Sequence, residues 1–212
     1  MTKRLIPRFS RKESQEFIQI LNIRVNKYFK ENKVAKTGNW KLYLKSVIMF
    51  TLLITPFVLI LSFNISDWYK LLLAVVVGFG MAGVGMNVMH DGNHGSFSKY
   101  PWVNKLMGSS IYILAGNVFN WKVQHNVLHH TYTNIKDHDE DLEAGIVLRF
   151  SKHADWKPHH QFQHLYSFLL YGLLTLKWAI ISDFIRLSRY QKKNLSYANS
   201  KSHPVQWVGL II

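Results

Sequence analysis

Two long runs of apolar residues dominate the pattern of hydrophobic and polar positions along the chain. The first covers residues 46–63 and the second residues 71–89, and neither contains a charged side chain. A bilayer core about 30 Å thick needs roughly twenty apolar residues in a helix, so each run with its flanks is long enough for one crossing. The connection, residues 64–70, is short and ends near Trp68 and Tyr69, which is typical of a membrane interface. The pattern predicts a transmembrane helical hairpin with both ends on the same side.

Glycine is frequent in the second apolar run. The positions are Gly78, Gly80, Gly83 and Gly85. Small residues let membrane helices approach each other closely, but glycine is also common in membrane helices without any packing role. The sequence leaves both interpretations open.

Three weaker apolar stretches follow the hairpin. Residues 103–119 contain Lys105 and lie between two histidine clusters that are expected to share one site, so this stretch should dip into the bilayer and return, or lie in the interface. Residues 165–185 have basic flanks on both sides, which argues against a simple crossing and favours an interfacial or half-buried helix. Residues 205–212 look like the beginning of another span. We therefore expect an all-α, integral-membrane helical protein with a transmembrane hairpin plus interfacial helices.

Positive charge is concentrated at the start of the chain. The net charge is +14, and residues 1–45 hold twelve Lys or Arg against three Glu. A basic arm of this kind can bind nucleic acid or mark the cytoplasmic side of a membrane protein. Because the arm runs directly into an apolar run and carries no nucleic-acid motif, we interpret it as a basic cytoplasmic segment and expect no nucleic-acid partner. Residues 17–25 fit a helix lying on the membrane surface or one packed on its own domain.

The chain shows no secretory signal and no cysteine. A signal peptide places a modest apolar core directly after a short basic stretch, whereas the first apolar run here begins only after residue 45. The absence of cysteine excludes disulfides and thiolate metal sites, so any metal must have nitrogen and oxygen ligands. Eleven histidines make such ligands available.

Five of the histidines form two regularly spaced clusters. His90 and His94 are four residues apart at the end of the second apolar run, and the group His125, His129 and His130 repeats this spacing further on. Residues four apart share one face of an α-helix. Ionisable groups beside a bilayer are costly and usually functional, and neutral imidazole is the commonest metal ligand. We expect a metal site on the cytoplasmic side, although imidazole suits Zn, Cu, Fe and Ni alike.

Other polar residues near these clusters each admit two interpretations. His160 and His164 are also four apart, and they either add a metal contact or simply share a helical face. Side chains that could orient the imidazoles are Asp91, Asn93, Asn126, Asp137, Asp139 and Asp141. The acidic group at 137–143 is at least as well explained as a solvated loop.

The motifs HDGNH at 90–94 and HNVLHH at 125–130 closely resemble the first two histidine boxes of membrane fatty acid desaturases. Trp121 before the second box and Tyr132-Thr133-Asn134 after it strengthen the resemblance. The likeness is nearest to bacterial acyl-CoA or acyl-lipid desaturases, including linoleoyl-CoA (front-end) desaturases, and it covers roughly residues 45–212. Either box alone would be a weak motif, whereas the pair at this spacing after a hairpin is specific.

This resemblance implies a non-haem di-iron centre that uses O2. The ligands that it implies are His90, His94, His125, His129 and His130. It also implies an acyl-CoA or acyl-lipid substrate, and electrons from ferredoxin or cytochrome b5. His203-Pro204 lacks the two glycines that follow in the haem motif of fused cytochrome b5 domains, so we expect a separate donor. The family's third histidine box is missing from 46–212, which we therefore expect to be an incomplete and inactive desaturase domain.

Two other functions share part of this pattern. A related membrane di-iron hydroxylase, acting on alkanes, carotenoids or sphingolipids, would carry similar histidine boxes. A non-catalytic membrane metal-binding or transport protein would place polar groups along its spans, but both runs lack charge and the histidines gather at one end. The sequence favours a desaturase in the membrane, most simply a bacterial inner membrane, with both boxes cytoplasmic.

Overall fold

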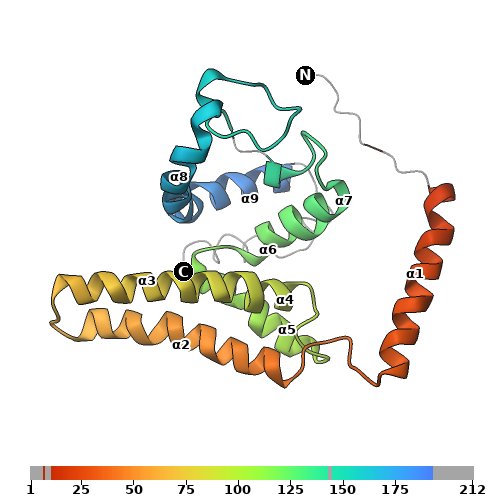
Figure 1. The fold of residues 1–212 in the computed structure, drawn as a ribbon, viewed down its shortest axis with the longest axis horizontal. Helices are drawn as coiled ribbons and strands as arrows, with labels where there is room; N and C mark the ends of the chain where they lie inside the picture. The colour runs from red at the N-terminus through yellow and green to blue at the C-terminus, as the bar shows by residue number, and fades with distance from the viewer. Residues whose placement is uncertain (1–6, 8–10, 143–144, 193–212) are drawn as a thin grey trace.

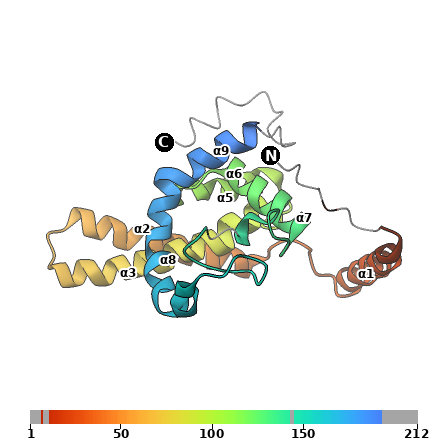
Figure 2. The same cartoon turned by 90° about the horizontal axis from the view of Figure 1, so that it is seen from above.

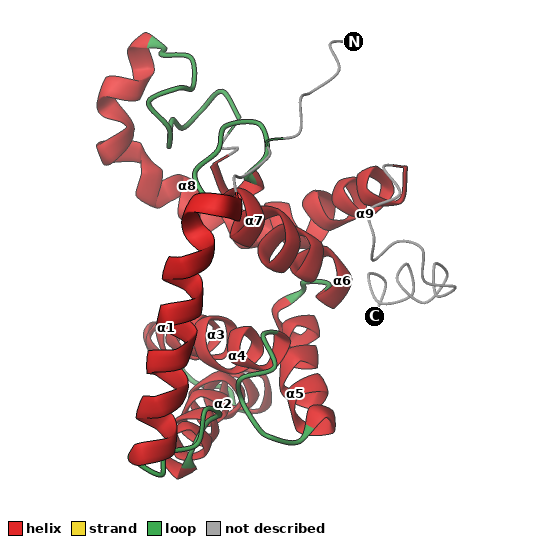
Figure 3. Cartoon of the chain, turned by 90° about the vertical axis from the view of Figure 1, so that its right-hand side faces the viewer, coloured by secondary structure: helices red, strands yellow, loops and turns green. Residues whose placement is uncertain are grey.

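The computed structural model describes residues 7, 11–142 and 145–192, and its regular structure within these ranges is helical throughout (Figure 1, Figure 3). The predicted all-α class is therefore confirmed for this part of the chain. The helical segments in chain order are α1 Arg11–Glu31, α2 Trp40–Ser62, α3 Asp67–Gly83, η1 Val84–Met89, α4 His90–Asn93, α5 Pro101–Gly108, η2 Ser109–Leu114, α6 Val118–Trp121, η3 Lys122–His129, α7 His130–Tyr132, η4 Glu140–Leu142, η5 Pro158–Phe162, α8 Gln163–Lys177, η6 Trp178–Ser182 and α9 Asp183–Lys192.

The predicted hairpin is present as two long antiparallel helices that lie side by side (Figure 1). The first is α2, which begins before the uncharged run because the side chain of Asn39 caps it by accepting a hydrogen bond from the Lys41 amide. The second runs without a break through α3, η1 and α4, from Asp67 to Asn93. Both are long and apolar enough to cross a membrane, and only 17% of the most apolar window of each is buried. A core helix of a soluble protein would be mostly buried, whereas apolar helices exposed to this extent fit an environment of lipid.

Two of the four glycines in the second helix allow it to pack closely on α2. A Cβ atom at Gly80 would collide with the backbone of Leu53, and one at Gly83 would collide with the side chain of Met49. Gly78 has no neighbouring atom within 4 Å of the place where a Cβ would lie. Close packing between membrane helices requires small residues only at the crossing point. The packing interpretation therefore holds for Gly80 and Gly83 but not for Gly78.

Two apolar clusters hold the helices around the histidines. One joins the hairpin to the segment that follows it, and its buried members are Leu53, Val84, Val88, Phe97 and Leu114. The other packs α6 and η3 against α9, and its buried members are Phe119, Val123, Leu187 and Tyr190. Each histidine box therefore extends from an element that is anchored in its own cluster.

Most of the stretch at 103–119 is helical, formed by α5 and then η2, and the residue after η2, Ala115, is in the left-handed conformation with φ of 58°. Its α5 part lies against α4 because Gly92 and Gly108 carry no side chains at the contact. The side chain of Asn93 donates a hydrogen bond of 3.1 Å to the carbonyl of Gly108 and fixes this contact. The place of the stretch relative to a membrane stays a prediction.

The remaining helices lie around this hairpin framework. The stretch at 165–185 is helical, formed by α8, η6 and the start of α9 (Figure 2), and its expected interfacial position stays a prediction. Helix α1 stands apart, at the end of the molecule opposite the hairpin turn (Figure 1, Figure 2). Its expected contact with a membrane surface is likewise untested. His203 and residues 205–212 lie outside the described residues.

Candidate metal centre

Wide π-helical turns precede or carry both histidine boxes. The π-helical segment η1 leads directly into His90, and η3 contains His125 and His129. In η3 the His130 amide bonds to the His125 carbonyl, which is the i→i+5 pattern of a π-helix. The wider turn brings residues four and five positions on back to one side, so His129 and His130 both lie beside His125. The sequence predicted the shared side but an ordinary α-helix, and π-turns of this kind often occur at functional sites.

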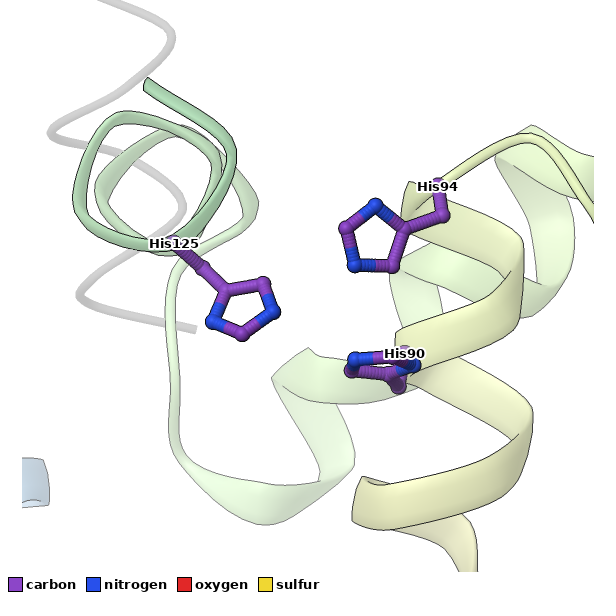
Figure 4. A group of neighbouring side chains, drawn as sticks. All are labelled: His90, His94 and His125. Atoms are coloured by element: carbon purple, nitrogen blue, oxygen red, sulfur yellow. The ribbon is translucent and has the colours of Figure 1, made fainter. Parts of the chain in front are cut away.

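All five box histidines come together. His90 and His94 from the hairpin helix face His125 across a gap between the two boxes (Figure 4). The ring centre of His94 lies 5.2 Å from that of His125 and 5.0 Å from that of His130. The rings of His125 and His129 stack at 5.2 Å. Five imidazoles within contact distance form a compact cluster of nitrogen donors.

His125 is the member that two possible metal-binding groups share. One group is His90, His94 and His125, and the other is His125, His129 and Asp141; the candidate ligand atoms within each group lie within 4.8 Å of one another. Two adjoining groups that share one side chain give room for either one metal ion or a close pair. Histidine nitrogen and carboxylate oxygen are ligands that suit iron, among other transition metals.

A buried nitrogen in this cluster has no hydrogen-bond partner among the described residues. It is the Nε2 of His125. Leaving a buried polar atom without a partner costs about 1–3 kcal/mol, and a metal ion bound there would remove this cost. Burial, followed by repulsion from the neighbouring histidines, lowers the pKa of His125 to about 4, and the same causes lower the pKa of His94. Both rings are therefore neutral near pH 7, as a metal ligand must be.

Carboxylates lie beside the Nδ1 nitrogen of two box histidines, His129 and His90. Asp139 is 1% exposed, and both of its oxygens lie 3.1 Å from the Nδ1 atom of His129. An oxygen of Asp141 lies 3.2 Å from the same nitrogen, and Asp91 lies 3.2 Å from Nδ1 of His90. A carboxylate that accepts from Nδ1 leaves Nε2 free to face a metal and fixes the ring orientation.

Asp139 also organises the loop that follows the second box. The backbone amides of Asn134 and Asp141 donate to it at 2.8 Å and 3.0 Å. Burial alone would raise the pKa of Asp139, but these amides and His129 together lower it, so the carboxylate stays charged. The sequence left open whether this acidic group was a solvated loop or a set of orienting residues; for Asp139 the second interpretation is correct, whereas Asp137 is exposed.

Trp121 forms an aromatic wall beside the cluster. Its ring stacks on His125 with centres 4.6 Å apart and planes 29° apart. The same ring meets His90 at 5.7 Å and His94 at 5.5 Å, edge to face. The indole therefore contacts both histidine boxes and covers part of the cluster.

Helix α9 fastens the second box through a buried carboxylate. Asp183, which is 1% exposed, accepts hydrogen bonds from the Asn117 amide at 2.8 Å and from Nε1 of Trp178 at 2.6 Å. Asn120 donates to the Asp183 carbonyl at 2.8 Å. The sequence analysis assigned no role to Asp183, although this acid lies inside the apolar stretch at 165–185. An acidic side chain inside an apolar stretch is costly unless it has hydrogen-bond partners, and this was the sequence signal that could have indicated its role.

A second fastening joins the acidic loop to the same helix. The hydroxyl of the buried Tyr190 donates to Glu140, and Arg186 and Arg189 lie 3.9 Å and 3.5 Å from the same carboxylate. Glu140 stands between Asp139 and Asp141, so α9 helps to position the two carboxylates that face His129. Neither Tyr190 nor Glu140 was singled out from the sequence.

The other histidines in the described part of the chain do not join the cluster. His160 is buried, but its Nδ1 accepts from the Lys157 amide and its Nε2 lies 3.1 Å from the Ile146 carbonyl. His164 is exposed. Both ring nitrogens of His160 are engaged with backbone groups, and His164 is exposed on the next helical segment, so the structure does not bring the two together as a ligand pair. His138 and His159 likewise bond to backbone carbonyls.

Comparison with known proteins gives a consistent family. The family model described as "Fatty acid desaturase" matches residues 66–212. The chain is 37% identical to an sn-1 linoleoyl-lipid 6-desaturase of Arthrospira platensis, over 77% of this chain and 45% of that protein. It is 33% identical to an acyl-lipid (8-3)-desaturase of Physcomitrium patens, over 82% of this chain and 36% of that protein.

A third relative gives the same picture. The chain is 30% identical to an sn-1 linoleoyl-lipid 6-desaturase of Synechocystis, over 84% of this chain and 49% of that protein. The chain thus spans less than half the length of these relatives. No solved structure matches it.

Proposed function

The chain belongs to the fatty acid desaturase family, and we propose that it contributes the first two histidine boxes of an O2-dependent acyl-lipid desaturase. The observation that carries the proposal is the convergence of His90, His94, His125, His129 and His130 into one cluster, with a buried and unpartnered Nε2 on His125. Names of the relatives that mention linoleoyl-lipid support a lipid-linked acyl chain as the substrate.

Two iron ions are the cofactor that we propose for this cluster, held by the five box histidines together with ligands from the rest of the enzyme. When bound, they would supply the power to activate O2 and to break unactivated C–H bonds. The reaction removes two hydrogens from neighbouring methylene carbons; with two electrons and two protons from outside, O2 becomes two molecules of water. The electrons would come from a separate ferredoxin or cytochrome b5-type donor.

The residues of this chain have distinct tasks in that reaction. Asp139 holds the Nδ1 proton of His129 and so keeps its Nε2 directed inward. Asp91 does the same for His90. Trp121 covers the rings of both boxes and excludes water from them, which strengthens the electrostatic interactions inside the site.

We propose that the hairpin anchors this site in a membrane, with the basic N-terminal segment and both boxes on the cytoplasmic side. The positive-inside rule supports this orientation, because the Lys- and Arg-rich start of the chain precedes the first span. A hairpin returns the chain to the side from which it entered, so the boxes after the second span lie on the same side as residues 1–45.

Lipid analysis tests the proposed activity. The protein at its natural full length is expressed in a bacterium that makes no polyunsaturated fatty acids, fed with linoleic acid, and supplied with a ferredoxin or cytochrome b5 donor. We expect fatty acids with one additional double bond, and none in a His94→Ala variant. New hydroxylated fatty acids without new double bonds would show instead a hydroxylase, and linoleate left unchanged in a host where the protein holds iron would refute both.

A further inference from the structure

A hydrogen bond that uses neither an imidazole nor an indole joins the two histidine boxes. The Nδ2 atom of Asn126, in η3, donates to the backbone carbonyl of Asn93, in α4, at 3.3 Å. Along the chain Asn126 is next to His125 and Asn93 is next to His94, the two histidines that face each other in Figure 4. The bond therefore links the backbone of the first box to the second box directly beside the metal-binding cluster.

Both boxes are held to other elements, but the second is held only at its base. The Asn93 side chain donates to the Gly108 carbonyl at 3.1 Å, which fixes the first box on α5. The second box starts from α6, where Asn117 accepts from the Phe119 amide at 2.9 Å and is itself bonded to α9. Asn126 lies about two helical turns beyond this base. Its bond to Asn93 therefore acts where the base contacts no longer set the distance between the boxes.

The amide of Asn126 has an orientation that its surroundings dictate. A backbone carbonyl only accepts hydrogen bonds, so the amide nitrogen faces Asn93 and the oxygen faces away from it. That Oδ1 atom is buried and has no hydrogen-bond partner within the described ranges of the chain. Burying an amide oxygen without a donor is unfavourable, and an apolar side chain of similar shape avoids this cost. The amide is thus not the side chain that best stabilises the fold, and such departures are expected at functional positions.

The two candidate metal-binding groups depend differently on the distance between the boxes. The group of His90, His94 and His125 takes members from both boxes, whereas the group of His125, His129 and Asp141 belongs to the second box and the loop after it. In the first group the rings of His90 and His94 each lie 5.2 Å from that of His125. A metal ion tolerates errors of only a few tenths of an ångström in its ligand distances. A contact that sets the distance between the boxes therefore matters for the first group and not for the second.

We propose that Asn126 is a positioning residue that sets the distance between the two histidine boxes and so controls metal binding by the group of His90, His94 and His125. It acts through the backbone of the first box, because its amide nitrogen is committed to the Asn93 carbonyl. The inference rests on the proposed two-metal site, since only a metal ion that draws ligands from both boxes requires this distance to be fixed.

Equilibrium titration with Co²⁺ tests the inference without any turnover. The metal-free protein at its natural full length is purified in detergent, and visible absorption follows the binding of each Co²⁺ ion. Asn126→Leu preserves the approximate size of the side chain while removing both the N–H donor and the buried oxygen. Asn22→Leu is the matched control, at an exposed asparagine of α1. Thermal unfolding of the metal-free proteins reports the fold, and Asn126→Ala replaces the leucine variant if the latter does not fold.

We expect two Co²⁺ ions to bind to the wild type, and Asn126→Leu to weaken one of the two binding steps about 10- to 100-fold. The other step should stay within about twofold of the wild type, because its ligands lie on one side of the lost contact. Asp139→Asn, which removes the carboxylate beside His129, should weaken the step that Asn126→Leu leaves intact. Asn22→Leu should bind both ions as the wild type does.

Two results would overturn the role of Asn126. One is a folded variant with both binding steps unchanged, which would show that the boxes keep their distance without this bond. The other is an equal weakening of both steps, which would show a general effect on the fold instead of positioning between the boxes. Either result would leave the proposed function standing as long as the wild type binds two ions, whereas a folded wild type that binds none would remove the function itself.

Discussion

Replacing Asp139 with asparagine removes the charge that holds His129 while almost preserving the size of the side chain. The native carboxylate is 1% exposed and accepts from Nδ1 of His129, from the Asn134 amide and from the Asp141 amide. An asparagine has only one acceptor oxygen, so at least one of these donors is left facing an NH2 group. A hydrogen bond to a charged partner contributes about 1.5–3 kcal/mol. Loss of such an orienting contact typically lowers metal affinity about 10- to 100-fold.

The expected result for Asp139→Asn is therefore weaker metal binding in a protein that still folds. Titration of the metal-free protein with Co²⁺, followed by visible absorption, measures the affinity, and thermal unfolding reports the fold. Asp155→Asn is the matched control, because Asp155 is an exposed acid in a later loop. We expect the control to bind Co²⁺ as the wild type does. If Asp139→Asn binds within about twofold of the wild type, the orienting role assigned to Asp139 is wrong.

Three further predictions follow from the helix packing and the topology. Gly80→Ala should destabilise the hairpin by about 1–3 kcal/mol, because its Cβ would lie 2.6 Å from the Leu53 Cα. Gly78→Ala should leave the melting temperature in detergent nearly unchanged. Equal changes in melting temperature for the two variants would contradict the packing. Tyr190→Phe should lower the free energy of unfolding by about 1–3 kcal/mol through the lost hydrogen bond to Glu140. It should also speed hydrogen exchange in α9, and an unchanged exchange rate would show that this contact does not stabilise the helix. A single cysteine in place of Ser66, in a chain without native cysteine, should react with a membrane-impermeant reagent only from outside the cell, and reaction from the cytoplasm alone would reverse the topology.

The hairpin and the five histidines were predictable because their determinants are local in sequence. Uninterrupted apolar length predicts a membrane helix, and a four-residue spacing predicts a shared side. The same reasoning failed to give the start of α2 at Trp40, since the cap by Asn39 depends on a single side chain within a basic segment. The match of the family model to residues 66–212 agrees with the resemblance carried by the two boxes.

Features that depend on contacts distant in sequence could not be read in advance. Val123 of the π-helical segment η3 packs in one cluster with Leu187 and Tyr190 of α9, a contact that no local pattern reveals. Asp139 is buried because Asn134 and His129 fold around it, although a run of acids ordinarily indicates a solvated loop. For the same reason, sequence alone could not separate the structural His160 from the histidines of the cluster.

The most direct test of the metal centre is the amount of iron bound at equilibrium by the purified wild-type protein and by a His125→Ala variant, measured by elemental analysis after anaerobic dialysis against Fe²⁺. His125 belongs to both candidate metal-binding groups, so its loss should affect every iron in the cluster. The account predicts bound iron in the wild type and its near-complete loss in the variant, with the helical content of the two proteins unchanged. Iron retained in full by His125→Ala, or no iron in a folded wild type, would contradict it.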